Sequence, residues 1–267
     1  MMIQKQFISN LASRKMRIDK RGQHEFREIS IETGVIAKAE GSARVKIGKT
    51  EVIAGVKMSV GTPFADTPDE GVLMVGAEFS PIASPDFEKG PPAENSIELA
   101  RVVDRGIRES GALDMKKLCI KAKEKVWMVF VDIHILNHAG NLIDAAGLAS
   151  IAALSTTKMP DYDEETESVN YEKKHKKLLV KFKPIPVTVF RMGDSLFLDP
   201  SLEEEDVMSI RLTVTTKDDG NIAAIQKGGP SSLPMAEIEK AFELSLRKGA
   251  EIREMLDSAL KSKQEKE

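Results

Sequence analysis

The sequence has a single cysteine, Cys119, among its 267 residues. One cysteine cannot form a disulfide bond within the chain, so a small disulfide-stabilised fold is excluded, and this scarcity is typical of the reducing cytoplasm. The sequence also lacks any apolar run close to the roughly 18 residues that a transmembrane helix needs. We therefore expect a cytoplasmic protein with no membrane partner.

A large excess of charge of either sign is also missing. Lysine and arginine number 39 and acidic residues 42, which gives a net charge of -3. A strongly basic chain is a common sign of nucleic-acid binding, so any basic site here has to be a local arrangement. The contents of 41% hydrophobic and 30% charged residues are those of an ordinary globular protein.

Several familiar catalytic and metal-binding motifs are absent. The run GKT at 48–50 resembles the end of a P-loop, but Ala43 stands where the motif needs glycine, and a strand pattern follows. These residues predict a hairpin turn. His134 and His138, with Asp132 before them, have no cysteine pair or HExxH sequence to complete a site, so we predict no metal and no cofactor.

The N-terminal residues 1–18 are basic and contain no acid, which superficially resembles a transit peptide. We favour a short helix instead, because Phe7, Ile8 and Leu11 form one apolar face that can dock on the rest of the protein. Residues 1–25 are predicted to be an N-terminal helix and arm.

A first domain is predicted over residues 26–160. Its β-rich runs between 26 and 80 are separated by glycine, proline and aspartate turns and indicate an antiparallel sheet. The apolar spacing predicts a helix from about Glu94 to Ser110. The run 125–137 predicts a strand, and the alanine-rich run 142–157 predicts a helix packed closely on a sheet.

A second domain is predicted over residues 178–262, with several strands followed by a helix from about 234 to 260. The intervening residues 161–177 are acidic and then basic, which indicates a charged linker or loop, and 263–267 form a charged tail. The fold class is therefore α+β, with two similar subdomains that are each a mixed sheet packed with helices.

The sequence HAGNLIDAAG at 138–147 follows a predicted strand and begins a predicted helix. Backbone N–H groups at the start of a helix point at an anion, and the helix dipole favours negative charge, so this arrangement is typical of phosphate sites. The segment contains no arginine or lysine. A phosphate site here would have to be completed from elsewhere in the protein.

Three arginines, Arg101, Arg105 and Arg108, form one stripe on the predicted helix 94–110. Planar guanidinium groups suit bidentate recognition of phosphate. The alternative is a solvated face on which each arginine pairs with an acid three or four residues away, and the pattern alone favours this alternative.

The segments EFSPIASPDFEKGPP at 78–92 and IELARVVDRGIRES at 97–110, with 17–57 and 129–154, resemble the ribonuclease PH family. Within that family they are most similar to the non-catalytic ring subunit of the archaeal exosome. The resemblance runs from about Arg17 to the final helix.

The resemblance implies two ribonuclease PH-type subdomains and a hexameric ring. In such rings three copies of this subunit alternate with three copies of a catalytic paralogue, RNA-binding cap subunits cover the ring, and single-stranded RNA threads the pore. Inorganic phosphate attacks the 3′-terminal phosphodiester and releases a nucleoside diphosphate.

The resemblance implies that active members of the family have a sequence similar to Gly-Gly-Thr/Ser-Arg at the phosphate site, in which the arginine and the hydroxyl hold phosphate. The matching residues of this chain are Ala139, Gly140, Asn141 and Leu142. The cation and the hydroxyl are both missing, so the site is degenerate. We expect Asn141 to cap the helix, and Asp144 to accept hydrogen bonds from its free N–H groups and repel a phosphate.

The resemblance also implies that active relatives have two acidic residues six positions apart. In this chain Asp206 stands at the first position and Leu212 at the second. Asp206 is a candidate remnant of that pair, or simply a surface acid in the acidic run 203–206. We predict no catalytic residue in this chain.

In the family, arginines of the 94–110 helix grip the RNA backbone beside the active site of the paralogue. We therefore expect Arg101 and Arg105 to bind RNA phosphates, with Arg108 as a weaker candidate. The leading hypothesis is a non-catalytic subunit that binds RNA and helps to structure the partner's active site. The alternatives are an independently active phosphate-dependent 3′–5′ exoribonuclease and a scaffold that does not contact RNA.

Overall fold

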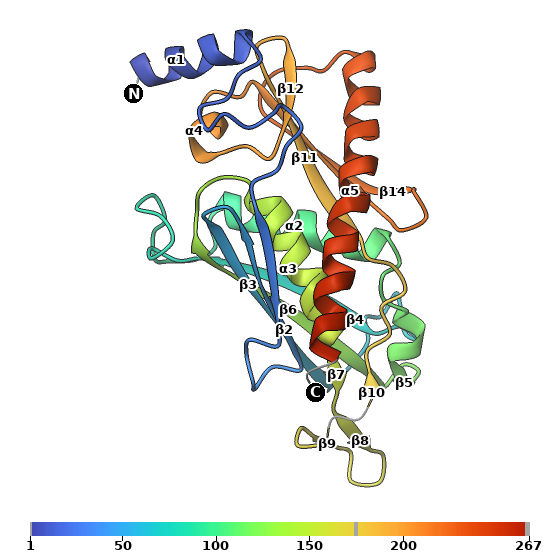
Figure 1. The fold of residues 1–267 in the computed structure, drawn as a ribbon. Coiled ribbons are helices and arrows are strands. Elements are labelled where there is room, and N and C mark those ends of the chain that lie inside the picture. Colours follow the sequence, from blue (N-terminus) through green and yellow to red (C-terminus); the bar gives the residue numbers. More distant parts are fainter. Residues whose placement is uncertain (1, 174–175, 265–267) are drawn as a thin grey trace.

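The computed structural model describes residues 2–173 and 176–264, in which a larger and a smaller sheet enclose helices (Figure 1). The larger sheet has the strand order β1-β2-β3-β6-β4, with β5 paired to β6. Its strands are β1 (Ile29–Thr33), β2 (Gly41–Ile47), β3 (Thr50–Gly61), β4 (Val72–Phe79), β5 (Cys119–Lys121) and β6 (Lys125–Asn137).

One part of the larger sheet differs from the prediction. Strands β1, β2 and β3 are antiparallel as predicted, but β6 lies between β3 and β4, and β4 is parallel to β6. A parallel neighbour needs a crossover connection, which helix α2 (Glu94–Glu109) provides between β4 and β6. The predicted turn at 48–50 is confirmed, because Ile47 pairs with Thr50 and Gly48 has a φ of 58°.

The smaller sheet has the order β12-β11-β13-β14. Its strands are β11 (Ile185–Met192), β12 (Ser195–Leu198), β13 (Ile210–Thr216) and β14 (Ile222–Gly228). Two α+β subdomains are thus present, as predicted. The second sheet is antiparallel in all three of its pairings, where a mixed sheet was expected, because short connections join β11 to β12 and β13 to β14.

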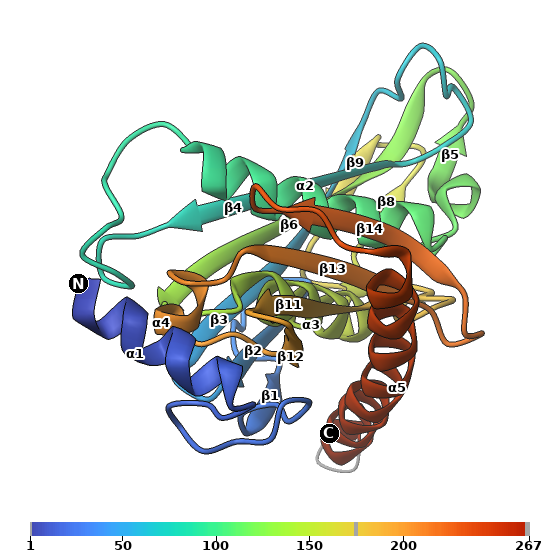
Figure 2. The same cartoon turned by 90° about the horizontal axis from the view of Figure 1, so that it is seen from above.

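Helix α3 (Leu142–Thr156) lies between the two sheets, and α2 lies beside it against β4 and β14 (Figure 2). Every residue of α3 except Thr156 is buried. Its small side chains permit this contact on both sides, since a Cβ atom added to Gly147 would overlap Pro186 on β11. The N-terminus of α3 is consequently fixed at the junction of the two sheets.

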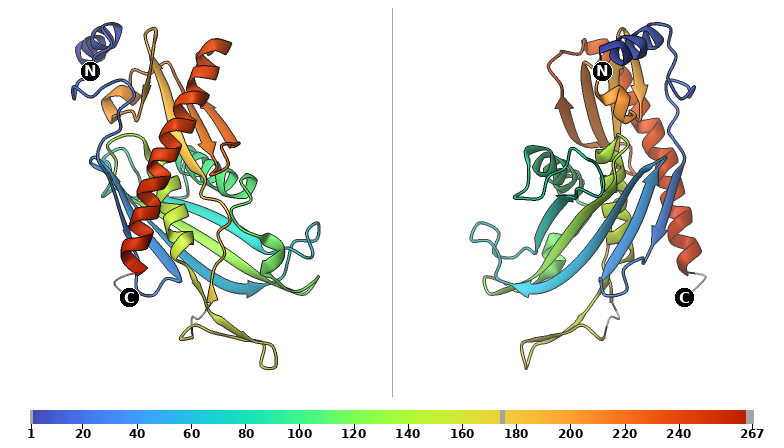
Figure 3. Two further views of the ribbon diagram at one scale, coloured as in Figure 1. Left: turned by 45° about the vertical axis from the view of Figure 1, so that its right-hand side comes forward. Right: turned by 90° about the vertical axis from the view of Figure 1, so that its left-hand side faces the viewer.

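Helix α5 (Met235–Gln264) packs on β11 and β13 and continues to β1 of the larger sheet (Figure 3). Its buried apolar side chains are Ala241, Leu244, Ile252 and Leu256. The predicted helix is confirmed and extends to residue 264, so the predicted tail begins inside it and 265–267 lie outside the described residues. None of the helices in the described chain has the length and apolar character required to cross a membrane.

The N-terminal helix α1 (Met2–Ser13) docks on the β11–β12 hairpin. Ile8 is 3% exposed and packs in a cluster with Phe190 and Phe197. Phe7 is 53% exposed. The predicted docking is therefore right for Ile8, whereas Phe7 faces solvent.

Residues 161–170 of the predicted charged linker form a hairpin that projects from the larger sheet (Figure 3). Strands β8 (Asp161–Asp163) and β9 (Ser168–Asn170) pair antiparallel, and the Tyr162 ring packs edge-on against Trp127 at 6.3 Å between ring centroids. This aromatic contact holds the hairpin against the rest of the protein. The charge pattern of the sequence predicts only a polar segment here and gives no sign of the contact. The remaining short elements are η1 (Met115–Leu118), β7 (Lys158–Met159), β10 (Lys176–Lys177) and α4 (Leu202–Glu205).

Candidate functional site

A pocket of about 150 Å³ opens beside the start of α3. Its walls come from both domains: the end of β4 and the loop after it, the first turns of α2, the start of α3, and strands β11 and β13. The lining residues are Phe79, Phe87, Asn95, Glu98, Leu99, His138, Asn141, Leu142, Ile143, Thr188, Glu205 and Arg211. The predicted phosphate position thus lies in a real pocket.

The N-terminus of α3 already contacts an anion from the protein itself. The backbone N–H of Asn141 donates to Oε1 of Glu205 at 2.8 Å. A carboxylate at this position has the favourable interaction with the helix N-terminus that a phosphate would otherwise have. Burial raises the pKa of Glu205 to about 6, although the Asn141 N–H opposes this rise. The position expected for phosphate is filled by Glu205.

Asn141 occupies the N-cap position of α3, as predicted, but its side chain makes no capping hydrogen bond. The residue has left-handed backbone angles, with φ 58° and ψ 46°. Its Nδ2 donates instead to Asp144 at 2.9 Å and to Asp199 at 2.8 Å. Asparagine tolerates the left-handed conformation better than most residues, and the two carboxylates fix the orientation of its amide.

Asp144 faces the smaller sheet and makes no contact with the free N–H groups of α3, so the predicted role at the helix start is wrong. Its carboxyl accepts hydrogen bonds from the Thr188 backbone N–H at 2.9 Å and the Thr188 hydroxyl at 2.7 Å. The residue is 2% exposed, and burial raises its pKa to about 7. Asp144 therefore links α3 to β11 and does not face the pocket.

Leu142 and Gly140 shape the degenerate site. Leu142 lines the pocket with an apolar side chain where the family resemblance places a cation. Gly140 has a φ of 92°, and a Cβ atom there would lie 2.5 Å from the Pro200 carbonyl oxygen. Its own carbonyl accepts a hydrogen bond from the Thr50 hydroxyl at 2.6 Å. The loop before α3 is held firmly by the protein.

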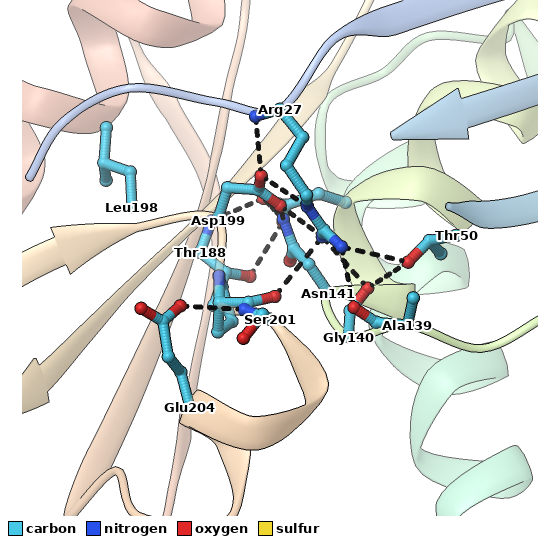
Figure 4. A network of polar contacts seen from close by, with 12 residues as sticks. Arg27, Thr50, Ala139, Gly140, Asn141, Thr188, Leu198, Asp199, Ser201 and Glu204 are labelled. Atoms are coloured by element: carbon cyan, nitrogen blue, oxygen red, sulfur yellow. Dashed lines mark hydrogen bonds and ion pairs between the residues drawn. The ribbon is translucent and has the colours of Figure 1, made fainter. Parts of the chain in front are cut away.

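A buried ion-pair network fixes this loop (Figure 4). Arg27 donates through Nη2 to Asp199 Oδ1 at 2.6 Å and through Nη1 to the Ala139 carbonyl at 2.6 Å. Arg21 adds a second bond to Asp199 at 2.7 Å. Burial alone would raise the pKa of Asp199, but the hydrogen bonds and charge of Arg27 lower it. Asp199 is therefore a buried anion with two guanidinium partners.

The candidate remnant acid lies outside the pocket. Asp206 is exposed at the C-terminal cap of α4, and Leu212 is buried on β13. Within the acidic run 203–206, the residue that lines the pocket is Glu205. Sequence reasoning missed it because the acidic run 203–206 is too short and uniform for its pattern to show which carboxylate turns inward.

The arginine stripe of α2 is exposed, as predicted, but its members differ. Arg108 is paired with Asp104 at 2.7 Å, and Arg105 makes a 3.3 Å hydrogen bond to Gln226. Arg101 has no hydrogen-bond or ion-pair partner within the part of the chain that the structure describes. Glu98, the expected partner of Arg101, binds Arg211 at 2.6 Å instead.

The histidines considered as metal ligands point to different surroundings. His134 lies on β6 and is 3.4 Å from Glu78, whereas His138 lies in the pocket and stacks on Phe87 with 5.4 Å between ring centroids. Burial lowers the pKa of His138. No group of three or more potential metal ligands occurs among residues 2–173 and 176–264.

The two domains and their junction match a known family. Residues 25–160 match domain 1 and residues 184–248 match domain 2 of the 3′ exoribonuclease family, the ribonuclease PH type. The chain belongs to this family. The resemblance seen in the sequence is confirmed.

Within the family, the chain is similar to exosome subunits. It is 50% identical over 251 residues to exosome complex component Rrp42 of Methanosarcina mazei, covering 94% of this chain and 92% of the relative. The Rrp42 of Thermococcus gammatolerans is 49% identical over 257 residues, covering 96% and 94%. A chain of the Archaeoglobus fulgidus exosome with RNA bound to the active site superposes with a TM-score of 0.88 at 48% identity, covering 94% and 97%.

Proposed function

We propose that this chain is a non-catalytic subunit of an exosome, an RNA-degrading 3′–5′ phosphorolytic complex. It binds single-stranded RNA and helps to structure the active site of a catalytic ribonuclease PH-type paralogue. Its partners are that paralogue, in three heterodimers that form a hexameric ring, and RNA-binding cap subunits. The similarity to Rrp42 over nearly the whole chain supports the complex, and the single cysteine supports a cytoplasmic location.

The observation that carries the non-catalytic assignment is the contact between Glu205 and the N-terminus of α3. Phosphorolysis requires inorganic phosphate and an RNA phosphodiester to be held together. Here Glu205 accepts the Asn141 N–H at 2.8 Å, and the apolar Leu142 lines the pocket beside it. Both features disfavour a bound phosphate.

A direct assay distinguishes this proposal from an independently active exoribonuclease. Purified chain is incubated with single-stranded RNA, magnesium and phosphate, alone and with the catalytic paralogue, and released nucleoside diphosphate is measured. We expect release only when the paralogue is present. Release by this chain alone would contradict the proposal.

The RNA contact is assigned to Arg101 and Arg105, because both are exposed on one face of α2 and Arg101 has no partner in the described chain. Arg108 contributes less, since Asp104 already neutralises it at 2.7 Å. These side chains would contact phosphates without reading sequence. The stripe begins at Arg101, three residues beyond Glu98, which lines the pocket.

Replacing Arg101 and Arg105 by alanine in the assembled ring is expected to weaken single-stranded RNA binding. Binding without these two phosphate contacts releases fewer counterions from the RNA. The negative slope of log affinity against log salt concentration should therefore become shallower by about 1.4. Binding is measured by fluorescence anisotropy across a salt series.

The matched control is Lys116→Ala with Lys117→Ala, which removes the same charge from exposed residues of η1. This control should leave the salt slope unchanged. If the arginine variant also keeps its slope, the chain is a scaffold without RNA contact.

A further inference from the structure

The pocket beside α3 has an aromatic wall. The Phe79 and Phe87 rings are 4.7 Å apart between centroids, and Phe87 stacks on His138 at 5.4 Å with an interplanar angle of 14°. All three side chains line the pocket and are partly exposed. Flat, partly exposed aromatic groups of this kind favour a planar ligand.

Asn141, one of the residues that line the pocket, has a side-chain acceptor without a donor. Asn141 is 2% exposed, and its Oδ1 is buried without a hydrogen-bond partner among the described residues. Its Nδ2 donates to Asp144 and Asp199, which fixes which amide atom is the oxygen. A buried unpaired acceptor is costly, which points to a donor that binds from outside the chain.

Glu205 provides a second acceptor beside it. Its Oε1 accepts the Asn141 N–H, while Oε2 lies 3.9 Å from His138 Nε2, too far for a hydrogen bond. Gly140 N–H donates to His138 Nδ1 at 3.3 Å, so the imidazole proton of the neutral ring is on Nε2. The pocket thus presents a carboxylate oxygen of Glu205 and, next to it, the Nε2–H donor of His138.

The charges in the pocket disfavour an anion. Its one arginine, Arg211, is held by Glu98 at 2.6 Å, and Glu205 has no comparably close cation. A phosphate or carboxylate ligand would face Glu205 and the Asn141 oxygen with no free guanidinium group to bind it. A neutral ligand that donates through an amino group and accepts beside it is complementary.

We propose that this pocket binds an amino-bearing nucleobase of the cytosine type, either as a free nucleoside or as a nucleotide of single-stranded RNA. The base lies against Phe79 and Phe87. Its exocyclic amino group donates to Glu205 and Asn141, and the adjacent ring nitrogen accepts from His138. Uracil has the opposite pattern, a carbonyl beside a ring N–H, and places an acceptor against the two acceptors of the site.

Titration of cytidine and uridine into the purified full-length chain, followed by calorimetry, tests the proposal. We expect cytidine to bind about tenfold or more tightly than uridine, because the uridine carbonyl leaves buried acceptors unpaired. Inorganic phosphate should not compete. The test does not depend on the proposed exosome role, since it uses the isolated chain and free nucleosides.

A second arm uses short oligocytidine and oligouridine to distinguish the two sources of the base. Oligocytidine and oligouridine share the same phosphate contacts, so a preference for oligocytidine as large as that for cytidine over uridine assigns the pocket to RNA. Loss of the preference in the oligomers assigns the pocket to free nucleosides. Equal binding of cytidine and uridine, or no binding of either nucleoside or oligomer, would overturn the proposal.

The variant Glu205→Gln tests the role of the carboxylate. The Gln oxygen can still accept a hydrogen bond from the Asn141 N–H. The amide Nε2 group then takes the position of Oε2 and presents a donor to the ligand. The preference for cytidine over uridine should then fall toward one, whereas Glu203→Gln, an exposed change one position before the buried Glu204, should leave it unchanged. The comparison of nucleosides on the unaltered chain decides the proposal even if Glu205→Gln does not fold.

Discussion

Replacing Asp199 by alanine is expected to lower the free energy of unfolding by about 3–5 kcal/mol. The change leaves two guanidinium groups, those of Arg27 and Arg21, without their buried anion, because Asp199 accepts from both at 2.6 Å and 2.7 Å. It also removes one of the two acceptors of the Asn141 amide. A buried charge without a partner costs more than an intact pair contributes, so most of the loss comes from the arginines left behind.

Urea denaturation of the purified chain measures this loss. Asp206→Ala is the matched control, since Asp206 is exposed, and it should change stability by less than about 0.5 kcal/mol. The double variant Arg27→Ala with Asp199→Ala should lose less than the sum of the single variants, because the two side chains share one interaction. A loss at Asp199 no larger than at Asp206 would show that the network does not stabilise the fold.

The second large effect concerns pH. The pKa of Asp144 is raised from 3.8 to about 7 by burial, so the folded state keeps a proton that the unfolded state has released. The contribution of this group to the free energy of unfolding is therefore highest below pH 3.8, falls as pH rises toward about 7, and then levels off, with a total fall of about 4 kcal/mol. Glu205 acts in the same direction over a narrower range.

The variant Asp144→Asn should flatten this dependence. Oδ2 of Asp144 accepts from the Thr188 N–H and from Asn141 Nδ2, roles that an amide oxygen fills equally well. The amide nitrogen can take the place of Oδ1 and donate to the Thr188 hydroxyl, which in turn donates to Thr213. The variant should thus be more stable than the wild type at pH 8, by up to about 4 kcal/mol, and gain much less at pH 5.

Denaturation curves at pH 5 and pH 8 provide the measurement, and the difference between the two values is the quantity of interest. Asp66→Asn, a change of an exposed carboxylate, should keep the wild-type difference. An unchanged difference in Asp144→Asn would mean that Asp144 is already ionised in the folded protein at pH 5, which would contradict a raised pKa.

The helices and most strands of this fold are predictable from the sequence because their signals are local. The apolar spacing of α2 and the alanine-rich composition of α3 predict both elements close to their observed bounds. The parallel pairing of β4 with β6 is not predictable in this way, since the position and direction of β4 beside β6 depend on how the crossover helix α2 packs. This pairing is determined by the tertiary arrangement and not by a local sequence pattern.

The same limit applies to the site. The degenerate positions Gly140, Asn141 and Leu142 were predictable as a group, because they are consecutive and resemble a family motif. Arg27 and Asp199 are 172 residues apart, so no pattern in the sequence connects them. Asp144 was expected to bind the free N–H groups at the start of α3. The hydroxyl and the N–H of Thr188 on β11 instead determine the direction of its side chain.

The position of α5 has a consequence for biosynthesis. This helix covers β11 and β13, reaches β1, and is the last element of the described chain to leave the ribosome. Leu244 and Leu256 are buried in the folded protein. Until α5 has been synthesised, the apolar surface that they cover on the two sheets is exposed to solvent. The nascent chain therefore exposes apolar surface on both domains until α5 has left the ribosome, and protection by a chaperone during this interval would reduce its aggregation.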